Sequence, residues 1–174
     1  MTTYVLMAGL PGTGKSTLAE ALARELRGVV LSKDAVRAAL FAGELTDYTR
    51  EQDDLCFGMA LDAAQYLAER RRTEFVFLDG RTFSRREQFE QAIHAAEKSG
   101  CAWRIILATC PDEIAEARLM ADLGKHPATN RTVALYREVK AHFEPIIYPY
   151  FEIDTSQPFE SCIERALGAF RDAD

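Results

Sequence analysis

Short apolar runs alternate with longer amphipathic stretches along this sequence of 174 residues. The short runs are typical of buried strands and lie at 4–9, 28–32, 74–80, 102–110 and 150–154. Between them, apolar residues recur at helical spacing, which predicts helices at about 15–26, 33–41, 50–72, 84–98, from 111 onward, 132–143 and 159–171. Strands that alternate with helices indicate an α/β fold, in which helices cover both faces of a parallel sheet.

We expect one domain that spans residues 1–174, because the sequence contains no internal repeat, low-complexity tract or linker. The longest expected helix, 50–72, carries four apolar residues on one face: Leu55, Met59, Ala63 and Leu67. In a parallel sheet of this kind, ligands bind beyond the carboxyl ends of the strands. Three polar motifs fall at these ends, at 9–17, 32–37 and 79–85.

Composition and charge narrow the class of protein. Hydrophobic residues make up 48% of the chain, enough for a core, yet no stretch reaches the ~20 apolar residues of a membrane-spanning helix. The net charge of −6 disfavours non-specific coating of nucleic acid but is compatible with a basic active site. The four cysteines form no CxxC pair, and the apolar N-terminal run leads directly into a glycine-rich motif. We therefore expect a cytoplasmic protein with reduced thiols, no zinc site and no signal peptide.

The motif GLPGTGKST, residues 9–17, matches the phosphate-binding pattern GxxxxGK[ST] in full. It lies between an expected strand and an expected helix, where glycines let backbone amides surround phosphates. Lys15 can neutralise β- and γ-phosphate oxygens, and the Ser16 hydroxyl can ligate Mg²⁺. The sequence thus predicts a nucleotide-binding loop made of Gly9, Leu10, Pro11, Gly12, Thr13, Gly14, Lys15, Ser16 and Thr17.

A carboxylate ends the apolar run FVFLDG, residues 75–80. Asp79, at the tip of this expected strand, can hold a magnesium ion through a water molecule. It can also be a loop residue that caps the next helix. Ser16 and Asp79 are the predicted metal-binding residues.

The stretch LSKDAVR, residues 31–37, carries candidate chemistry for an acceptor. Asp34 and Arg37 are one helical turn apart and share a face above the end of the second strand, toward the phosphate loop. Phosphoryl transfer needs a carboxylate that takes the proton of an acceptor hydroxyl, which Asp34 can supply, while Arg37 can fix the acceptor. The same residues also suit an ordinary helix start, in which Ser32 caps the helix and Asp34 complements its dipole. Both interpretations can hold at once.

Together the motifs resemble a family of AAA-type P-loop kinases that contains the 5′-hydroxyl polynucleotide kinases, with chloramphenicol phosphotransferases and zeta-type toxin kinases as relatives. The resemblance covers nearly the whole chain and rests on GLPGTGKST, SKDAVR, FVFLDGRTFSRREQF, CPDEIAEARL and FEIDTS. It implies a P-loop NTPase fold, a three-layer αβα sandwich with a five-stranded parallel sheet and a helical lid. It also implies that Asp34 is the general base, that Arg37 contacts the acceptor, and that residues 154–158 border the adenine of ATP.

The resemblance further implies an arginine-bearing lid over the ATP phosphates, at about 117–131. Arg118 matches the first arginine of an R-L-x-x-R lid pattern, which makes it a nucleotide-binding and catalytic candidate beside Lys15, Asp34 and Arg37. Arg118 can alternatively be a charge on a solvated helix face.

The second lid arginine of the pattern is missing, because this chain has Asp122 at that position. Lys125, His126 or Arg131 can substitute for it. Arg81 and Arg85 can bind an acceptor phosphate or acidic group, or can be surface charges, and the sequence does not decide between these roles. Arg50 can face the acceptor cleft, although nothing in the sequence requires it.

These observations predict a kinase that transfers the γ-phosphate of ATP to a substrate hydroxyl with Mg²⁺. A small-molecule acceptor suits the small acidic chain; a polynucleotide 5′-end is favoured by the family but disfavoured by the absence of a basic stripe with stacking aromatics. A regulatory P-loop ATPase without a small acceptor is an alternative of another class, and we find neither a water-positioning residue nor a partner surface for it. A toxin-type kinase acting on nucleotide-sugars is a weaker alternative. The oligomeric state is not predicted.

Overall fold

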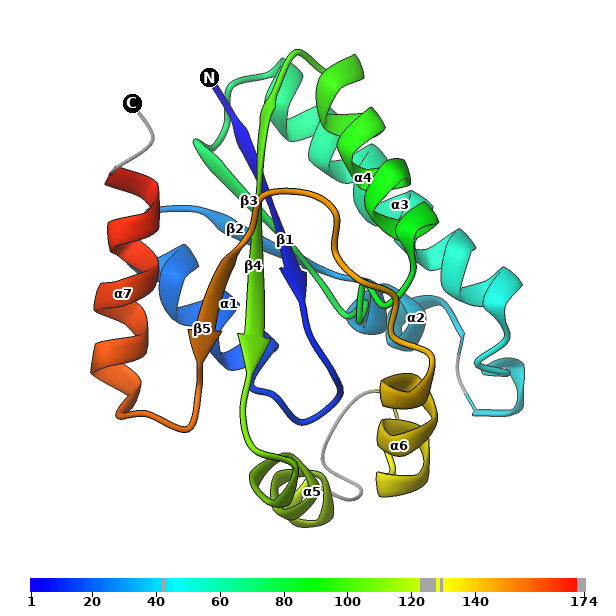
Figure 1. Cartoon of the computed structure of the whole chain (residues 1–174). Helices are drawn as coiled ribbons and strands as arrows, with labels where there is room; N and C mark the ends of the chain where they lie inside the picture. The colour runs from blue at the N-terminus through cyan, green and yellow to red at the C-terminus, as the bar shows by residue number, and fades with distance from the viewer. Residues whose placement is uncertain (42, 123–127, 129, 172–174) are drawn as a thin grey trace.

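A computed structural model describes residues 1–41, 43–122, 128 and 130–171. Its centre is a five-stranded sheet made of β1 (Thr3–Ala8), β2 (Val29–Ser32), β3 (Phe75–Asp79), β4 (Ala102–Thr109) and β5 (Phe151–Asp154). All neighbouring strands are parallel, and their order is β2-β3-β1-β4-β5 (Figure 1). The predicted α/β fold with a five-stranded parallel sheet is therefore confirmed.

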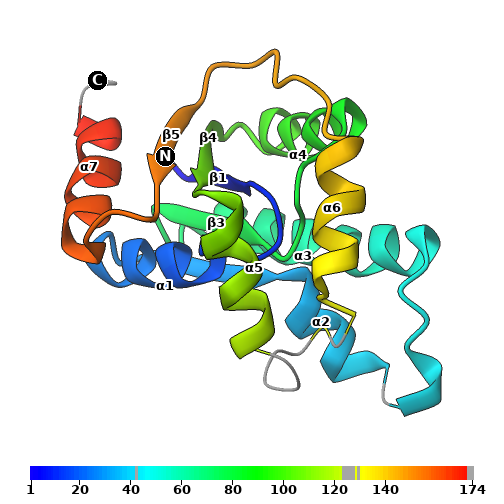
Figure 2. The same ribbon diagram turned by 60° about the horizontal axis from the view of Figure 1, so that its bottom comes forward.

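Helices lie on both faces and at one end of this sheet. They are α1 (Lys15–Glu25), α2 (Lys33–Leu40), α3 (Arg50–Glu69), α4 (Arg86–Lys98), α5 (Asp112–Ala121), α6 (Val133–Ala141) and α7 (Phe159–Arg171), with a short 3₁₀ turn at Gly43–Leu45. In Figure 1, α1 and α7 cover one face and α3 and α4 the other, while α2, α5 and α6 lie around the carboxyl ends of the strands (Figure 2). Within the described ranges, none of these helices combines the length and apolarity that crossing a membrane requires.

Strict alternation along β1 divides the core between the two faces of the sheet. Tyr4, Leu6 and Ala8 are fully buried and pack with α3 and α4. Val5 and Met7 are fully buried and pack with α1 and α7. Because successive side chains of a strand point to opposite faces, a central strand with apolar residues at every position from Tyr4 to Ala8 must be covered on both sides.

The long helix α3 packs against the sheet with a different face from the one predicted. Its buried residues are Gln52, Cys56, Phe57, Ala60, Leu61 and Ala64. The predicted residues Leu55 and Met59 are 49% and 39% exposed. The prediction was wrong because apolar residues occupy more than one face of this helix, and periodicity alone does not rank the faces. The ring of Phe57, which packs edge-to-face on Phe83 with centroids 5.8 Å apart, marks the inward face.

Gly80 determines how closely the end of β3 approaches the start of α2. The Ser32 hydroxyl accepts a hydrogen bond from the Ala35 N–H at 3.3 Å, so Ser32 caps α2 as predicted. Gly80 has a φ of 86°, and a Cβ at this position would lie 2.9 Å from the backbone nitrogen of Asp34. The missing side chain lets Asp34 and Asp79 line the same cleft.

Replacing Gly80 by alanine should therefore destabilise the fold, because the left-handed backbone and the close contact both oppose a Cβ. We expect Gly80→Ala to lower the free energy of unfolding by more than about 1 kcal/mol. The matched control is Gly58→Ala in α3, where a Cβ meets nothing within 4 Å and should raise stability by roughly 0.5–1 kcal/mol. Urea unfolding of both variants measures the two free energies, and shifts of the same sign would contradict this account.

Candidate active site

Glycines shape the loop between β1 and α1. Gly9, Gly12 and Gly14 have φ values of 137°, 79° and 82°. A Cβ on Gly9 would lie 2.4 Å from the carbonyl oxygen of Ala108, and a Cβ on Gly12 would lie 2.6 Å from the carbonyl oxygen of Ala115. Gly14 is also the N-cap of α1 and has no side chain to cap it. The first backbone N–H groups of α1 therefore remain available to phosphate oxygens.

Lys15 lies across this loop. Its ammonium donates to the carbonyl oxygens of Gly9 at 2.9 Å and Leu10 at 2.7 Å. Burial lowers the pKa of Lys15 to about 8; Arg131 adds to this shift, and the carboxylate of Asp79 opposes it. Phosphate oxygens that replace the two carbonyls would bring negative charge and favour the charged form of the lysine.

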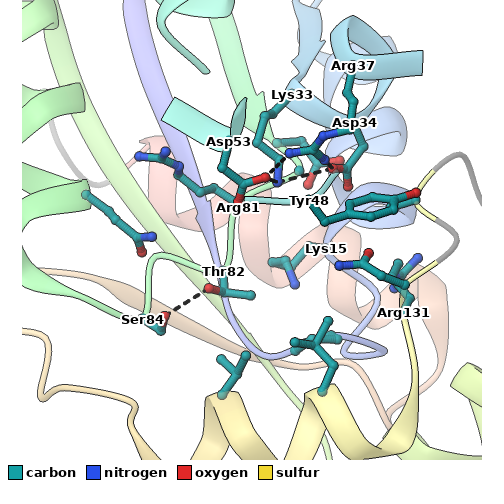
Figure 3. Close-up of a pocket in the computed structure, with 18 of the residues that line it drawn as sticks. Lys15, Lys33, Asp34, Arg37, Tyr48, Asp53, Arg81, Thr82, Ser84 and Arg131 are labelled. Carbon is teal, nitrogen blue, oxygen red and sulfur yellow. Dashed lines mark hydrogen bonds and ion pairs between the residues drawn. The ribbon is translucent and has the colours of Figure 1, made fainter. Parts of the chain in front are cut away.

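Two clefts meet beside the loop. The narrow cleft, of about 400 Å³, lies between the loop and a wall that includes Arg118 and Thr155. The wide cleft, of about 540 Å³, is lined by residues from α2, α3, the segment after β3, and α6 (Figure 3). Lys15, Ser16 and Arg131 line both clefts. A group that passes from one cleft to the other therefore passes these three side chains.

Asp34 belongs to a cluster of four charged side chains from α2 and α3. Its Oδ1 forms ion pairs with Lys33 Nζ at 3.2 Å and Arg37 Nη1 at 3.1 Å. Asp53 pairs with the same two cations, at 2.9 Å from Lys33. Two cations balanced by two carboxylates allow Lys33 and Arg37 to be buried. Oδ2 of Asp34 has no hydrogen bond to a described residue, and Asp34 lines the wide cleft (Figure 3).

Arg37 is held by contacts from two other segments besides Asp34. Its Nε donates to Gln52 Oε1 at 3.2 Å, its Nη2 pairs with Asp53, and its guanidinium carbon lies 5.0 Å from the ring centroid of Tyr48. Gln52 and Asp53 were not predicted as site residues, because both lie in the stretch TREQDD, residues 49–54, whose acidic residues suit a capped helix start. Their position on the first turns of α3 is the signal that could have identified them.

Asp79 is a buried carboxylate whose Oδ1 has no hydrogen-bond partner among the described residues. It does not cap α4, which begins at Arg86. Burying a carboxylate oxygen without a hydrogen-bond partner destabilises the folded state, and a hydrated cation nearby offsets this destabilisation. Asp79 and Ser16 line the wide cleft beside Lys15, and one hydroxyl with one carboxylate suits Mg²⁺, which keeps several waters and takes phosphate oxygens. The described residues contain no group of three or more His, Cys, Asp or Glu side chains that could hold a metal ion.

Arg118 lines the narrow cleft and not the wide one. Its Nη1 donates to the Thr155 hydroxyl at 3.0 Å and its Nη2 to the Thr155 carbonyl at 2.8 Å. The Thr155 hydroxyl donates in turn to the carbonyl of Thr13 at 2.8 Å. Arg118 is therefore joined to the phosphate loop through the segment that follows β5.

The other lid candidates differ in position. Asp122 is exposed at the end of α5 and lines the narrow cleft. Lys125 and His126 lie outside the described residues. Arg131 lines both clefts and makes no hydrogen bond or ion pair with any residue that the structure describes. Arg131 is thus the lid candidate that the structure places at the junction of the clefts.

Arg81 and Arg85 both line the wide cleft, but their guanidinium groups have different surroundings. Arg81 is 3% exposed, pairs with Asp54 of α3, donates to Gln91 Oε1 of α4 at 3.0 Å, and lies 4.4 Å from the ring centroid of Phe57. These contacts direct the group into the protein. Arg85 is more exposed and, like Arg50, stays accessible to a ligand.

A glycine-shaped phosphate loop after the first strand of a parallel sheet, with two clefts that meet at its lysine, defines a P-loop nucleotide-binding protein. A family model described as an AAA domain matches residues 5–146. The chain therefore belongs to this AAA domain family. Among curated proteins, no significant match is found.

Solved structures show the same fold over nearly the whole chain. A Chloroflexus aurantiacus protein provisionally described as a kinase has a TM-score of 0.76 and 17% identity, covering 99% of this chain and 97% of that one. The APS kinase of Mycobacterium tuberculosis has a TM-score of 0.72 and 17% identity, and the match covers 98% of this chain and 97% of the APS kinase chain. A gluconokinase from Sinorhizobium meliloti has a TM-score of 0.69 and 16% identity, and the match covers 98% of this chain and 92% of the gluconokinase chain. The chain thus has the fold of the P-loop kinases, as the sequence predicted.

The buried carboxylate of Asp79 yields a prediction about metal dependence. Mg²⁺ should strengthen ATP binding to the unmodified protein, and Asp79→Asn should remove about 10-fold or more of this gain, because an amide attracts a hydrated cation less than a carboxylate does. Calorimetric titration of ATP with and without Mg²⁺ measures the gain. Asp62→Asn on exposed α3 surface is the control. An undiminished magnesium effect in Asp79→Asn would exclude Asp79 from the metal site.

Proposed function

We propose that this protein is a kinase that uses Mg²⁺ and ATP to phosphorylate a hydroxyl group of a small molecule. The observation that carries the proposal is the position of Asp34, whose Oδ2 lacks a partner among the described residues, in a wide cleft that meets the phosphate loop at Lys15. A carboxylate beside the γ-phosphate position is what transfer to a hydroxyl requires.

ATP is assigned to the narrow cleft. The backbone amides at the start of α1 and the ammonium of Lys15 hold its β- and γ-phosphates, and Ser16 and Asp79 hold Mg²⁺. Arg118 and Thr155 border the nucleotide on the other wall. The similar APS kinase was solved with AMPPNP and APS bound, which supports a nucleotide site beside a small-molecule site in this fold.

The acceptor is assigned to the wide cleft. Its hydroxyl proton passes to Oδ2 of Asp34 as the oxygen bonds to the γ-phosphorus, and the bond between that phosphorus and the bridging oxygen of ADP breaks. Arg37 keeps Oδ1 of Asp34 occupied. A guanidinium has five N–H groups, and its three bonds to protein leave two that can reach the acceptor.

A small molecule suits this cleft better than a polynucleotide 5′-end. The volume of about 540 Å³ is that of a small-ligand site. Tyr48 is the only Phe, Tyr or Trp among its described lining residues, which offers little for stacking of bases. The similar gluconokinase and APS kinase, by their names, also act on small molecules.

Asp34→Asn tests the proposal directly. The variant should lose phosphate transfer by about 10²–10⁴-fold, because the amide does not accept the hydroxyl proton, while its affinity for ATP stays nearly unchanged. Labelled phosphate from ATP, followed into a panel of sugars, sugar acids, nucleosides and one 5′-hydroxyl oligonucleotide, measures transfer, and calorimetry measures ATP binding. Equal losses of ATP binding and transfer would show that Asp34 is not the base.

Arg131 is expected to supply the second positive charge on the transferring phosphoryl group, in place of the arginine that Asp122 replaces. ADP with Mg²⁺ and aluminium fluoride mimics that group and needs no acceptor. We expect Arg131→Gln to weaken binding of this complex by about 10-fold or more, with little change for ADP alone. The matched control is Arg137→Gln in α6, because the Arg137 guanidinium is exposed and pairs with Glu116 of α5. Equal effects on ADP and on the mimic would refute this role.

A further inference from the structure

The wide cleft is lined by an excess of positive charge although the chain is acidic. Its described lining contains seven Lys or Arg side chains and four Asp or Glu side chains, in a protein with a net charge of −6. A cleft lined by one sign of charge concentrates ligands of the opposite sign. A ligand responds most strongly to those charges that the protein itself does not neutralise.

Most of these cations have partners within the protein. The two cations of the cluster around Asp34 are balanced by its two carboxylates. Lys15 is turned toward the phosphate loop, and the buried Arg81 is paired with Asp54. None of these four groups is left to balance an anionic part of the acceptor, and Arg131 is assigned above to the transferring phosphoryl group.

Arg50 and Arg85, which we call the arginine rim, share one carboxylate. Arg50 Nη2 pairs with Glu87, and Arg85 Nε lies 3.4 Å from the same side chain. The other acid near Arg50 is Asp54, at 3.9 Å, and it already pairs with Arg81. Three guanidinium groups thus share two carboxylates. The rim side chains are 57% and 38% exposed, where ion pairs contribute little, so a ligand anion can replace Glu87 at small cost.

The segment that joins β3 to α4 supplies a polar floor for the cleft. Phe83 has a φ of 50° and is fully buried against Phe57 and Phe89, which turns its neighbours Thr82 and Ser84 to the cleft (Figure 3). The Thr82 hydroxyl donates to the Ser84 hydroxyl at 3.0 Å. The Thr82 carbonyl accepts from the Gly9 N–H at 3.0 Å, which fixes the floor to the phosphate loop. A hydroxyl-bearing ligand therefore meets polar groups held in place by the core.

We propose that the acceptor is a small hydroxyl compound that also carries a carboxylate or phosphate group, and that Arg50 and Arg85 bind this anionic group while the hydroxyl meets Asp34. The inference rests on the proposed kinase function and adds the class of acceptor. Guanidinium groups bind both kinds of oxyanion through charge-assisted hydrogen bonds, so the rim suits either.

Binding of matched ligand pairs to the protein saturated with Mg²⁺ and ADP tests the inference. The pairs are glucose with gluconate and ribose with ribose 5-phosphate, which separate the two anionic groups, and calorimetry measures each affinity. At least one acidic member should bind about 10-fold or more tightly than its neutral partner. Arg85→Gln and Arg50→Gln should each weaken that acid by about 10-fold.

Two further variants make the test specific to charge at the rim. Glu87→Gln removes the competing carboxylate and should strengthen binding of the acid. Arg86→Gln changes a neighbouring arginine that is 62% exposed, pairs with Glu90 and is absent from the cleft lining, so it should change nothing. Opposite effects of Glu87→Gln and Arg85→Gln are not expected from a general loss of structure.

Several outcomes would overturn the inference: no acidic member binds, neutral and acidic members bind alike, or the rim variants have no effect. Tight, salt-sensitive binding of a 5′-hydroxyl oligonucleotide at the same arginines would show that the acceptor is a nucleic acid and not a small acid. Asp34-dependent phosphate transfer to a neutral acceptor would refute the inference about the anionic group but would support the proposed kinase function. Binding of the acid at the arginine rim without any phosphate transfer from ATP would refute the proposed kinase function but would support anion binding by the rim.

Discussion

Parallel pairing of β1, β2 and β3 is the constraint on which the whole site depends. Parallel strands bring their carboxyl ends to one edge of a sheet, so the segments that follow them must lie side by side. The order β2-β3-β1 places the end of β3 between the start of α2 and the phosphate loop. Backbone pairing of Ser32 with Asp79, and of Gly9 with Thr82, fixes the three segments relative to one another. Three distant stretches of sequence thus form one site through main-chain bonds that use no functional side chain.

The charged cluster of α2 and α3 complements this backbone frame. Buried charges are tolerated when they are paired, and Lys33 and Arg37 are each paired twice. The pairing also gives the two oxygens of Asp34 different environments, because Oδ1 is bonded to cations while Oδ2 has no hydrogen bond to a described residue. Asp53 contributes by anchoring the cations to α3. The candidate base is therefore oriented by ion pairs within the protein.

The sequence predicted the parts of the site that depend on neighbouring residues. The phosphate loop and the capped start of α2 are each built within a few consecutive positions, so their residues and geometry follow from local chemistry. Contacts across the fold were not predictable in this way. Gln52 lies 15 residues from Arg37, and the roles of Arg81 stayed open until the structure paired it with Asp54, 27 residues away. The inward face of α3 was predicted wrongly for a related reason, since packing of Phe57 on Phe83 decides between several apolar faces.

The two carbonyl bonds of Lys15 bear on the thermodynamics of nucleotide binding. The ammonium is already withdrawn from water and aligned by Gly9 and Leu10 inside the loop. In the proposed complex, a phosphate would replace these carbonyl oxygens with its own, so the free energy of dehydrating and ordering a long flexible side chain would not weaken binding. Lys15 thus also stabilises the shape of the loop, through hydrogen bonds to two of the loop's own carbonyl groups.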